Sequence, residues 1–260
     1  MRLLLFVFGL PVLAHTLYFL PAKFQVRRGE KVVFSLHNGD AFPESESAVA
    51  PERLVDARLV HGERVRWIAD FQTLGKATHG VVEVTEPGSH WLAVQTRANL
   101  LELKADKFES YLREEGLERV IEWRRANGES GVPGKERYSK YAKSLIVSEA
   151  PDEGWRKVTG LEIEFVPETD PSGLRPGDNL PVRLVRKGKA AAGVRVEKAW
   201  VSGNDRGVEI VGRTDGEGRI TVRLERAGTW RLHAVEMERL RDRSAADWES
   251  YWATLTFEVR

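Results

Sequence analysis

The chain has 260 residues, of which 42% are hydrophobic and eight are tryptophan, so it has enough apolar material for a large core and two domains are expected. Forty basic residues balance 39 acidic ones, which argues against a nucleic-acid partner or an acidic membrane surface. The chain has no cysteine, which excludes disulfides, zinc–thiolate sites and iron–sulfur clusters.

Residues 1–14 have the pattern of a secretory signal peptide. A short basic start, Met1-Arg2, precedes the apolar run "LLLFVFGLPVLA", which is shorter than the roughly 20 residues that a membrane-spanning helix needs. Small residues before His15 predict cleavage after Ala14. The mature protein is therefore expected in the periplasm or outside the cell, with no transmembrane segment. A buried N-terminal strand is the alternative interpretation of this run.

Residues 15–102 are predicted to form a first β-sandwich domain of the immunoglobulin-like type. The segment "FQVRRGEKVVFSLHNG" alternates apolar and charged residues around a turn, which is typical of half-buried antiparallel strands. The segment "THGVVEVTEPGSHWLAVQT" repeats the pattern around "EPGS", and it predicts a hairpin.

Residues 103–150 are predicted to form a helical insertion. In "ADKFESYLREEG" the side chains of Phe108, Tyr111 and Leu112 share one helix face, and Gly116 is a plausible end signal. "LERVIEWRRANG" predicts a second helix, and "KERYSKYAKSLIV" at 135–147 predicts a third. We expect the apolar faces of this insertion to pack on the sheets.

Residues 151–260 are predicted to form a second β-sandwich. Strand patterns recur around the turn signals "TDGEGR" and "ERAGTW". With "GKAAAGVRVEKA" these segments resemble the transthyretin-like, or carboxypeptidase-regulatory-like, sandwich. The predicted fold class is therefore mainly β, with two sandwich domains and a helical insertion between them.

Several segments together resemble one known family. They are "AH" at the predicted cleavage site, "NGDAFPES", "LLELKADKFESYLREEGLE", "GKERYSKYAKSLI", "TDGEGRITVRL" and "DWESYWATLTFE". The chain resembles an exported bacterial family of unknown function that is associated with nickel uptake and is similar to the periplasmic component of nickel/cobalt transport complexes. The resemblance spans nearly the whole mature chain. It implies a role in divalent-metal uptake, with metal-transport membrane components as partners.

The six histidines include no closely spaced pair such as H-x-H or HExxH, so a metal site has to be assembled from distant segments. His15 is the strongest candidate ligand. At the start of a mature chain it would offer both an α-amine and an imidazole, and this combination suits nickel, cobalt or copper. The resemblance adds weight, because members of that family similarly begin their mature chain with histidine. The other interpretation is a polar residue that begins a strand.

His233, Glu236 and His37 are further candidate ligands. On an ideal strand His233 shares a face with Arg231 and Val235, whereas Glu236 lies on the other face. The resemblance implies a histidine near position 236, and Glu236 replaces it here. His37 lies beside "NGDAFPE", where the family also places polar residues. Each of these side chains has the alternative of a purely structural role.

The sequence contains no G-x-S-x-G motif, no cysteine nucleophile and no phosphate-binding loop, so a non-enzymatic role is expected. The predicted function is the binding or delivery of a divalent transition metal such as nickel, cobalt or copper. The alternative is a structural or interaction module that binds a protein or a glycan, with tryptophans as the glycan platform. Most tryptophans, however, are expected in the core.

Overall fold

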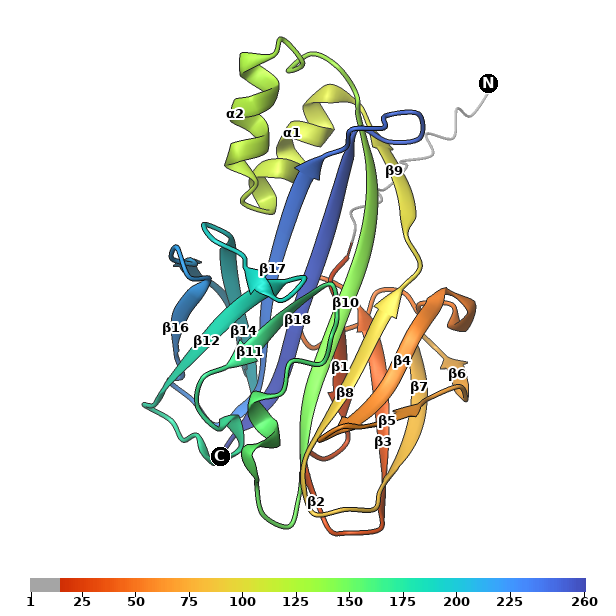
Figure 1. Cartoon of the computed structure of the whole chain (residues 1–260), viewed down its shortest axis with the longest axis vertical. Coiled ribbons are helices and arrows are strands. Elements are labelled where there is room, and N and C mark those ends of the chain that lie inside the picture. Colours follow the sequence, from red (N-terminus) through yellow and green to blue (C-terminus); the bar gives the residue numbers. More distant parts are fainter. Residues whose placement is uncertain (1–14) are drawn as a thin grey trace, which may run out of the picture.

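The computed structural model describes residues 15–260. The predicted signal segment, residues 1–14, lies outside the described residues, and its cleavage stays a prediction. Within residues 15–260 strands predominate, which confirms the mainly β fold class (Figure 1). The 18 strands of the described residues form one ten-stranded sheet and two four-stranded sheets.

The ten-stranded sheet runs through the middle of the molecule and draws strands from both halves of the sequence. All its pairings are antiparallel except those of β10 with β18 and with the short β2. Its strands, in spatial order, are β15 (Asp205–Arg213), β14 (Arg195–Ser202), β17 (Gly228–Arg239), β18 (Trp248–Val259), β10 (Gly134–Ser148), β8 (Gly88–Thr96), β4 (Leu54–His61) and β5 (Arg64–Trp67), while β2 (Gln25–Val26) and β9 (Asn99–Leu103) also pair with β10.

The first four-stranded sheet covers one face of this central sheet and contains only N-terminal strands. Their core includes Phe19 and Phe34, and it also takes in Ala142 and Ile146 of β10. The β1–β3 pairing sets Leu17 opposite Asn38. The strands, in spatial order, are β1 (Leu17–Pro21), β3 (Glu30–Asn38), β7 (Ala77–Val84) and β6 (Phe71–Leu74).

The second four-stranded sheet covers the opposite face and contains only C-terminal strands. Its core includes Phe165 and Leu184 together with Tyr141 and Leu145 of β10. Because side chains alternate along a strand, β10 supplies its even-numbered residues to one core and its odd-numbered residues to the other. The strands are β11 (Ile163–Pro167), β12 (Asn179–Arg186), β13 (Lys189–Ala190) and β16 (Arg219–Arg223).

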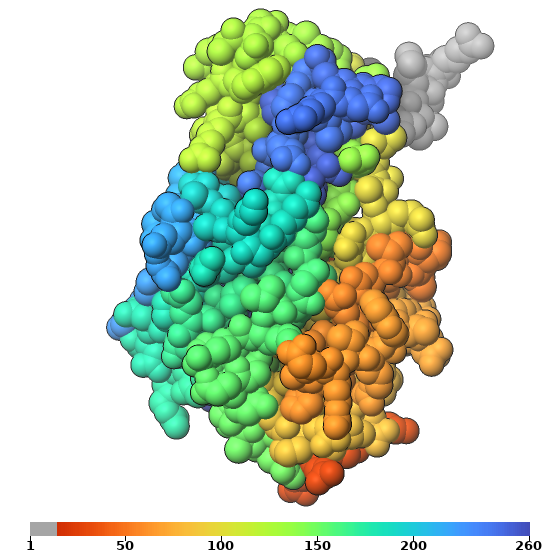
Figure 2. Space-filling model, viewed as in Figure 1, coloured from red at the N-terminus to blue at the C-terminus, as the bar shows by residue number. Residues whose placement is uncertain are grey.

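Two of the three predicted helices are present, and the third prediction is wrong. Helices α1 (Ala105–Glu114) and α2 (Glu118–Ala126) lie at one end of the molecule beside the 240–247 loop (Figures 1 and 2). The predicted helix 135–147 is instead strand β10, which has 15 residues. Its apolar residues recur at helical spacing, but both faces of the strand are buried, so tertiary packing overrides the local pattern.

The helices pack on the central sheet as the sequence predicted. Phe108, Tyr111 and Leu112 are almost fully buried and contact Trp248 and Trp252 of β18 in one core cluster. Five of the eight tryptophans are buried, whereas Trp67 is 65% exposed and lies at the edge strand β5. Most tryptophans therefore fill the core, as expected, and are not available as a surface platform.

The strands predicted at 77–96 are present, but they do not form a hairpin. β7 pairs with β3 and β6 in the first four-stranded sheet, whereas β8 pairs with β4 and β10 in the central sheet. The "EPG" turn therefore carries the chain from one layer to the other.

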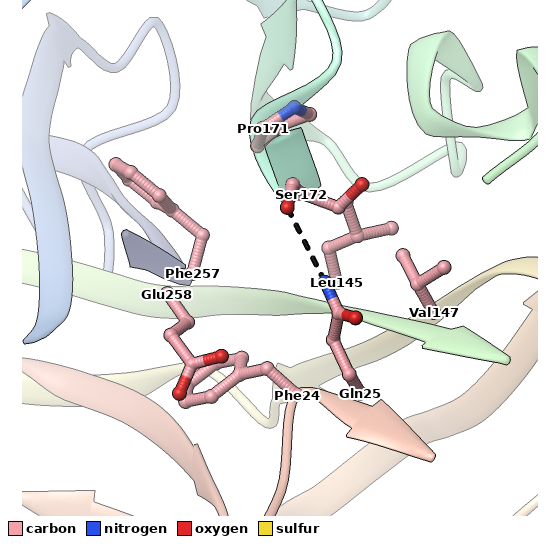
Figure 3. A pocket seen from close by; sticks show the side chains of 8 residues that line it. All are labelled: Phe24, Gln25, Leu145, Val147, Pro171, Ser172, Phe257 and Glu258. Atoms are coloured by element: carbon pink, nitrogen blue, oxygen red, sulfur yellow. Dashed lines mark hydrogen bonds between the residues drawn. The ribbon is translucent and has the colours of Figure 1, made fainter. Parts of the chain in front are cut away.

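A side-chain hydrogen bond links the N-terminal and C-terminal halves of the chain: Gln25 Nε2 donates to the carbonyl of Ser172 at 3.3 Å (Figure 3). The hollow around it has a volume of about 10 Å³, which is room for one water at most.

Three 3-10 turns complete the described elements. They are η1 (Pro51–Arg53), η2 (Glu153–Arg156) and η3 (Pro171–Gly173). Neither of the two α-helices in residues 15–260 combines the length and the apolar character that crossing a bilayer would demand.

Candidate metal centre

Within residues 15–260, three side chains lie close enough together to hold a metal ion: His15, Asp40 and Glu46. Their ligand atoms all lie within 4.8 Å of one another. His15 Nδ1 lies 3.0 Å from Asp40 Oδ2, and His15 Nε2 lies 3.6 Å from Glu46 Oε2. All three side chains are partly exposed, His15 by 24% and the two carboxylates by about half, so an ion can reach them from solvent.

The β1–β3 pairing explains why these residues meet. His15 lies two residues before β1, beside the end of β3, and the chain leaves β3 at Asn38 into the loop that carries Asp40 and Glu46. The loop turns sharply at Gly39, where a Cβ atom would lie 2.6 Å from the carbonyl oxygen of Glu44. A residue other than glycine would therefore force the two sides of this loop apart.

Each carboxylate uses one oxygen to fix itself and directs the other oxygen toward His15. Asp40 Oδ1 accepts a hydrogen bond from the Thr16 amide at 3.2 Å, and Glu46 Oε1 accepts one from the Asp40 amide at 3.1 Å. Asp40 Oδ2 and Glu46 Oε2 face the imidazole. The three donors are thus held near their places before any ligand arrives, which lowers the entropic cost of binding.

This donor set fits a divalent transition metal. Imidazole nitrogen and carboxylate oxygen ligate zinc, cobalt and nickel, with metal–ligand distances of about 2.0–2.2 Å. Ligand atoms within 4.8 Å of one another therefore need only a small contraction around an ion. With three protein donors, one or more coordination positions stay open for water, for a main-chain amine or for a transferred ligand.

The other three predicted ligands lie outside this cluster. His37 is engaged at both ring nitrogens, since Nε2 lies 2.9 Å from Ser35 Oγ and Nδ1 lies 3.0 Å from the Pro43 carbonyl. Burial lowers the pKa of His37. Glu236 faces Arg186 at 3.8 Å, on the side of the central sheet away from His15, and burial raises its pKa.

His233 lies on the same face of the central sheet as the first four-stranded sheet. Its ring stacks on Trp252 with centroids 5.4 Å apart, it is 6% exposed, and its Nε2 has no hydrogen-bond partner among the described residues. Val235 shares its face and Leu232 and Ala234 lie in the opposite core, so the predicted alternation along β17 is confirmed. Burial, with the charge of Arg231, holds the pKa of His233 well below its usual range.

His233 predicts a specific pH dependence of stability. In the unfolded chain the imidazole of His233 takes up a proton as the pH falls through about 6.5, whereas the folded protein keeps it neutral. Acidification therefore favours unfolding. At pH 5.0 the penalty reaches at most about 2 kcal/mol, the limit for an imidazole that stays neutral in the folded protein. In urea titrations, the stability difference between pH 7.5 and 5.0 is expected to shrink by about that amount in His233→Gln. An unchanged pH difference would contradict the prediction, whatever the variant's stability at pH 7.5.

Two further histidines form a separate pair in the N-terminal half. The rings of His61 and His90 stack with centroids 4.3 Å apart, beside a cavity of about 410 Å³ lined also by Arg64, Arg66 and Glu86. His61 Nδ1 lies 3.1 Å from the Ser89 carbonyl and His90 Nε2 lies 2.9 Å from the Glu86 carbonyl. Parallel rings this close cannot direct their free nitrogens at one ion, so this pair is not a second metal centre.

Asp40 and Glu46 are the functional candidates that sequence reasoning missed, since acidic neighbours are common by chance in this chain. The available signal was their place in "NGDAFPES", one of the segments on which the resemblance rests.

Behind them, the buried Lys140 donates from Nζ to the carbonyl of His15 and to Asn38 Oδ1. Burial lowers the pKa of this lysine to about 7. It lies in the segment predicted as a helix.

Similar solved structures share little sequence with this chain. The D0-D1 domain of Intimin is 12% identical, the match covers 92% of this chain and 96% of that chain, and the TM-score is 0.21. The Escherichia coli adhesin FdeC is 12% identical over 95% and 64% of the two chains, with a TM-score of 0.26. The Yersinia pseudotuberculosis adhesin InvE is 13% identical over 92% and 58%, with a TM-score of 0.22.

No curated protein matches the sequence. The family model described as Domain of unknown function (DUF4198) matches residues 12–238. The match covers most of the chain and includes all three residues of the candidate metal centre. The chain therefore belongs to the DUF4198 family.

Proposed function

We propose that the protein is an exported, non-enzymatic binder of a divalent transition metal, of the nickel, cobalt or copper type, and that His15, Asp40 and Glu46 are its ligands. The observation that carries the proposal is the convergence of one imidazole and two carboxylates, each carboxylate fixed by a backbone amide. The resemblance to nickel-uptake-associated proteins also supports a role in metal binding. A metal-transport component of the membrane is the proposed partner.

Export would add a further nitrogen donor, the α-amine of His15, to the same site. Cleavage after Ala14 would leave His15 as the first residue, and its α-amine and imidazole would then form one chelate. The side chains of Asp40 and Glu46 would complete a site with two nitrogen and two oxygen donors. This set suits nickel, cobalt and copper better than calcium or magnesium, which prefer oxygen ligands alone.

The test is metal binding by a protein that begins at His15. Nickel and cobalt affinities, measured by calorimetry, are expected to fall at least tenfold, or about 1.4 kcal/mol, in His15→Ala and in Asp40→Asn. Glu44→Gln is the matched control, because Glu44 lies in the same loop but pairs with Arg206; it is expected to bind like the wild type. Equal affinity in all four proteins would refute the site.

A protein with one extra residue before His15 isolates the contribution of the amine. If the amine ligates the metal, this extension weakens binding as much as His15→Ala does. If the extended protein binds like the wild type, the site consists of side chains alone. In either case affinity is expected to fall on acidification, because protons compete with the metal for the same ligand atoms.

A further inference from the structure

Lys140 is a buried lysine directly behind the candidate metal centre. It belongs to the middle of β10, pairs with Trp252 of β18 in the sheet register, and is 4% exposed. Its side chain lies on the face of the central sheet that β1 covers, since Ala142 of the same parity packs in that core. A buried lysine is costly unless its ammonium group is hydrogen-bonded, so its partners show what it does.

The partners of Lys140 belong to the two separate segments that make up the metal centre. Nζ donates to the main-chain carbonyl of His15, and it donates to Asn38 Oδ1 at 2.7 Å. The first contact fixes the residue that carries the imidazole. The second fixes the residue from which the loop with Asp40 and Glu46 departs.

Asn38 stands at the start of the loop and passes this constraint to its far end. The side-chain Nδ2 of Asn38 donates to Ser47 Oγ at 2.9 Å, and its main-chain N–H donates to Ser45 Oγ at 3.0 Å. Its carbonyl accepts from the amides of Glu46 at 3.0 Å and Ser47 at 3.2 Å. Through Asn38 the ammonium group therefore holds the loop in register with His15.

We propose that Lys140 is a positioning residue of the metal centre: one ammonium group, donating to His15 and Asn38, sets the spacing between the imidazole and the two carboxylates. The proposal rests on the metal-binding function proposed above. A preorganised donor set binds more tightly because less freedom is lost on binding. Lys140 contributes no ligand atom. Any positive charge on Nζ opposes a bound cation, so a purely electrostatic role would make the removal of Lys140 improve affinity.

The experiment compares Lys140→Met with Lys143→Met. Lys143 is the matched control, because it is an equally buried lysine of the same strand that faces the opposite core and pairs with Glu164. With nickel chloride or cobalt chloride as the probe, Lys140→Met is expected to weaken binding at least tenfold. Lys143→Met is expected to stay within twofold of the wild type, although it lowers stability.

A second variant covers the possibility that Lys140→Met does not fold. Asn38→Ala removes the link to the loop, and it is expected to weaken binding in the same direction. The double variant is expected to lose no more than Lys140→Met alone, because both changes break one chain of contacts. Additive losses would overturn the proposal, as would wild-type or tighter binding by Lys140→Met, or equal losses from Lys140→Met and Lys143→Met.

A measurement without metal separates this proposal from the metal-binding function. The Thr16 amide donates to Asp40, so its hydrogen exchange reports whether His15 and the loop stay in register. Relative to the amides of β10 in the same variant, exchange of this amide is expected to accelerate at least tenfold in Lys140→Met and to show no such local acceleration in Lys143→Met. If the wild type binds none of the metals, the proposed function fails, while this exchange result still decides the role of Lys140.

Discussion

Lys143→Met is expected to lower the free energy of unfolding by about 3–5 kcal/mol, because it leaves a carboxylate buried without its counterion. Lys143 Nζ lies 2.7 Å from Glu164 Oε2, and both side chains are fully buried. Although burial acts to raise the pKa of Glu164, the charge and hydrogen bond of Lys143, with the donors of Thr159, lower it. The carboxylate is therefore ionised beside Lys143. In Lys143→Met it either keeps an unpaired buried charge or takes up a proton that its remaining hydrogen-bond donors oppose, and both outcomes cost stability.

The same carboxylate organises the turn before β11, which adds to the expected loss. Its two oxygens also accept from the amides of Thr159, Gly160 and Leu161 and from the Thr159 hydroxyl, at 2.8–3.2 Å. Urea unfolding measures the effect. Lys157→Met is the control, since Lys157 pairs with the exposed Glu63, and its loss is expected to change stability by about 0.5 kcal/mol or less. A loss below about 1 kcal/mol in Lys143→Met would contradict the prediction.

Phe108→Ala is expected to destabilise the docking of the helical pair by about 3–5 kcal/mol, as is usual when a buried aromatic side chain is truncated. Phe108 is fully buried and lies against Gly134 so closely that a Cβ atom there would come within 2.2 Å of its ring. The guanidinium carbon of Arg124 lies 4.9 Å from the centre of the ring. The cavity left by truncation would thus open at the junction of α1, α2 and β10.

The melting temperature is expected to fall by roughly 6–20 °C if the helices unfold together with the sheets. Hydrogen exchange in residues 105–126 is expected to accelerate in any case. Lys107→Ala serves as the control, because Lys107 is the neighbour of Phe108 in the sequence but its side chain is exposed. If Phe108→Ala leaves both the melting curve and the exchange of residues 105–126 unchanged, the helical pair is a surface decoration that adds nothing to the core.

The local spacing of apolar and polar residues predicted most strands and both short helices, because one face of each of these elements meets the core and the other meets solvent. It failed at β10, where every residue from Tyr138 to Ser148 is buried. Such a strand has no polar face to produce alternation, and its apolar residues match a helical spacing by coincidence. It failed also at β7 and β8, because the sequence shows where a turn lies but not whether it joins neighbours in one sheet or crosses between layers.

The candidate site was predictable only at His15, where the chemistry of a chain-terminal imidazole singled out one residue. Asp40 and Glu46 meet it because β1 pairs with β3 in a particular register, and register depends on packing that the sequence does not display. Lys140 was hidden for a different reason. A lysine on a predicted surface helix is expected in water, so nothing suggested that its ammonium group would be buried against main-chain and amide oxygens.

The parallel pairing of β10 with β18 has a consequence for how the protein folds. These two strands lie side by side at the centre of the sheet, yet their paired residues Glu136 and Trp248 are more than 100 positions apart in the chain. Closing so long a loop costs entropy before any contact repays it, and domains dominated by such distant pairings fold slowly. Both cores include residues of β10, so neither core is complete until β10 has paired with β18. The two halves are therefore expected to mature together in one slow step, with exposed strand edges in the intermediate that precedes it.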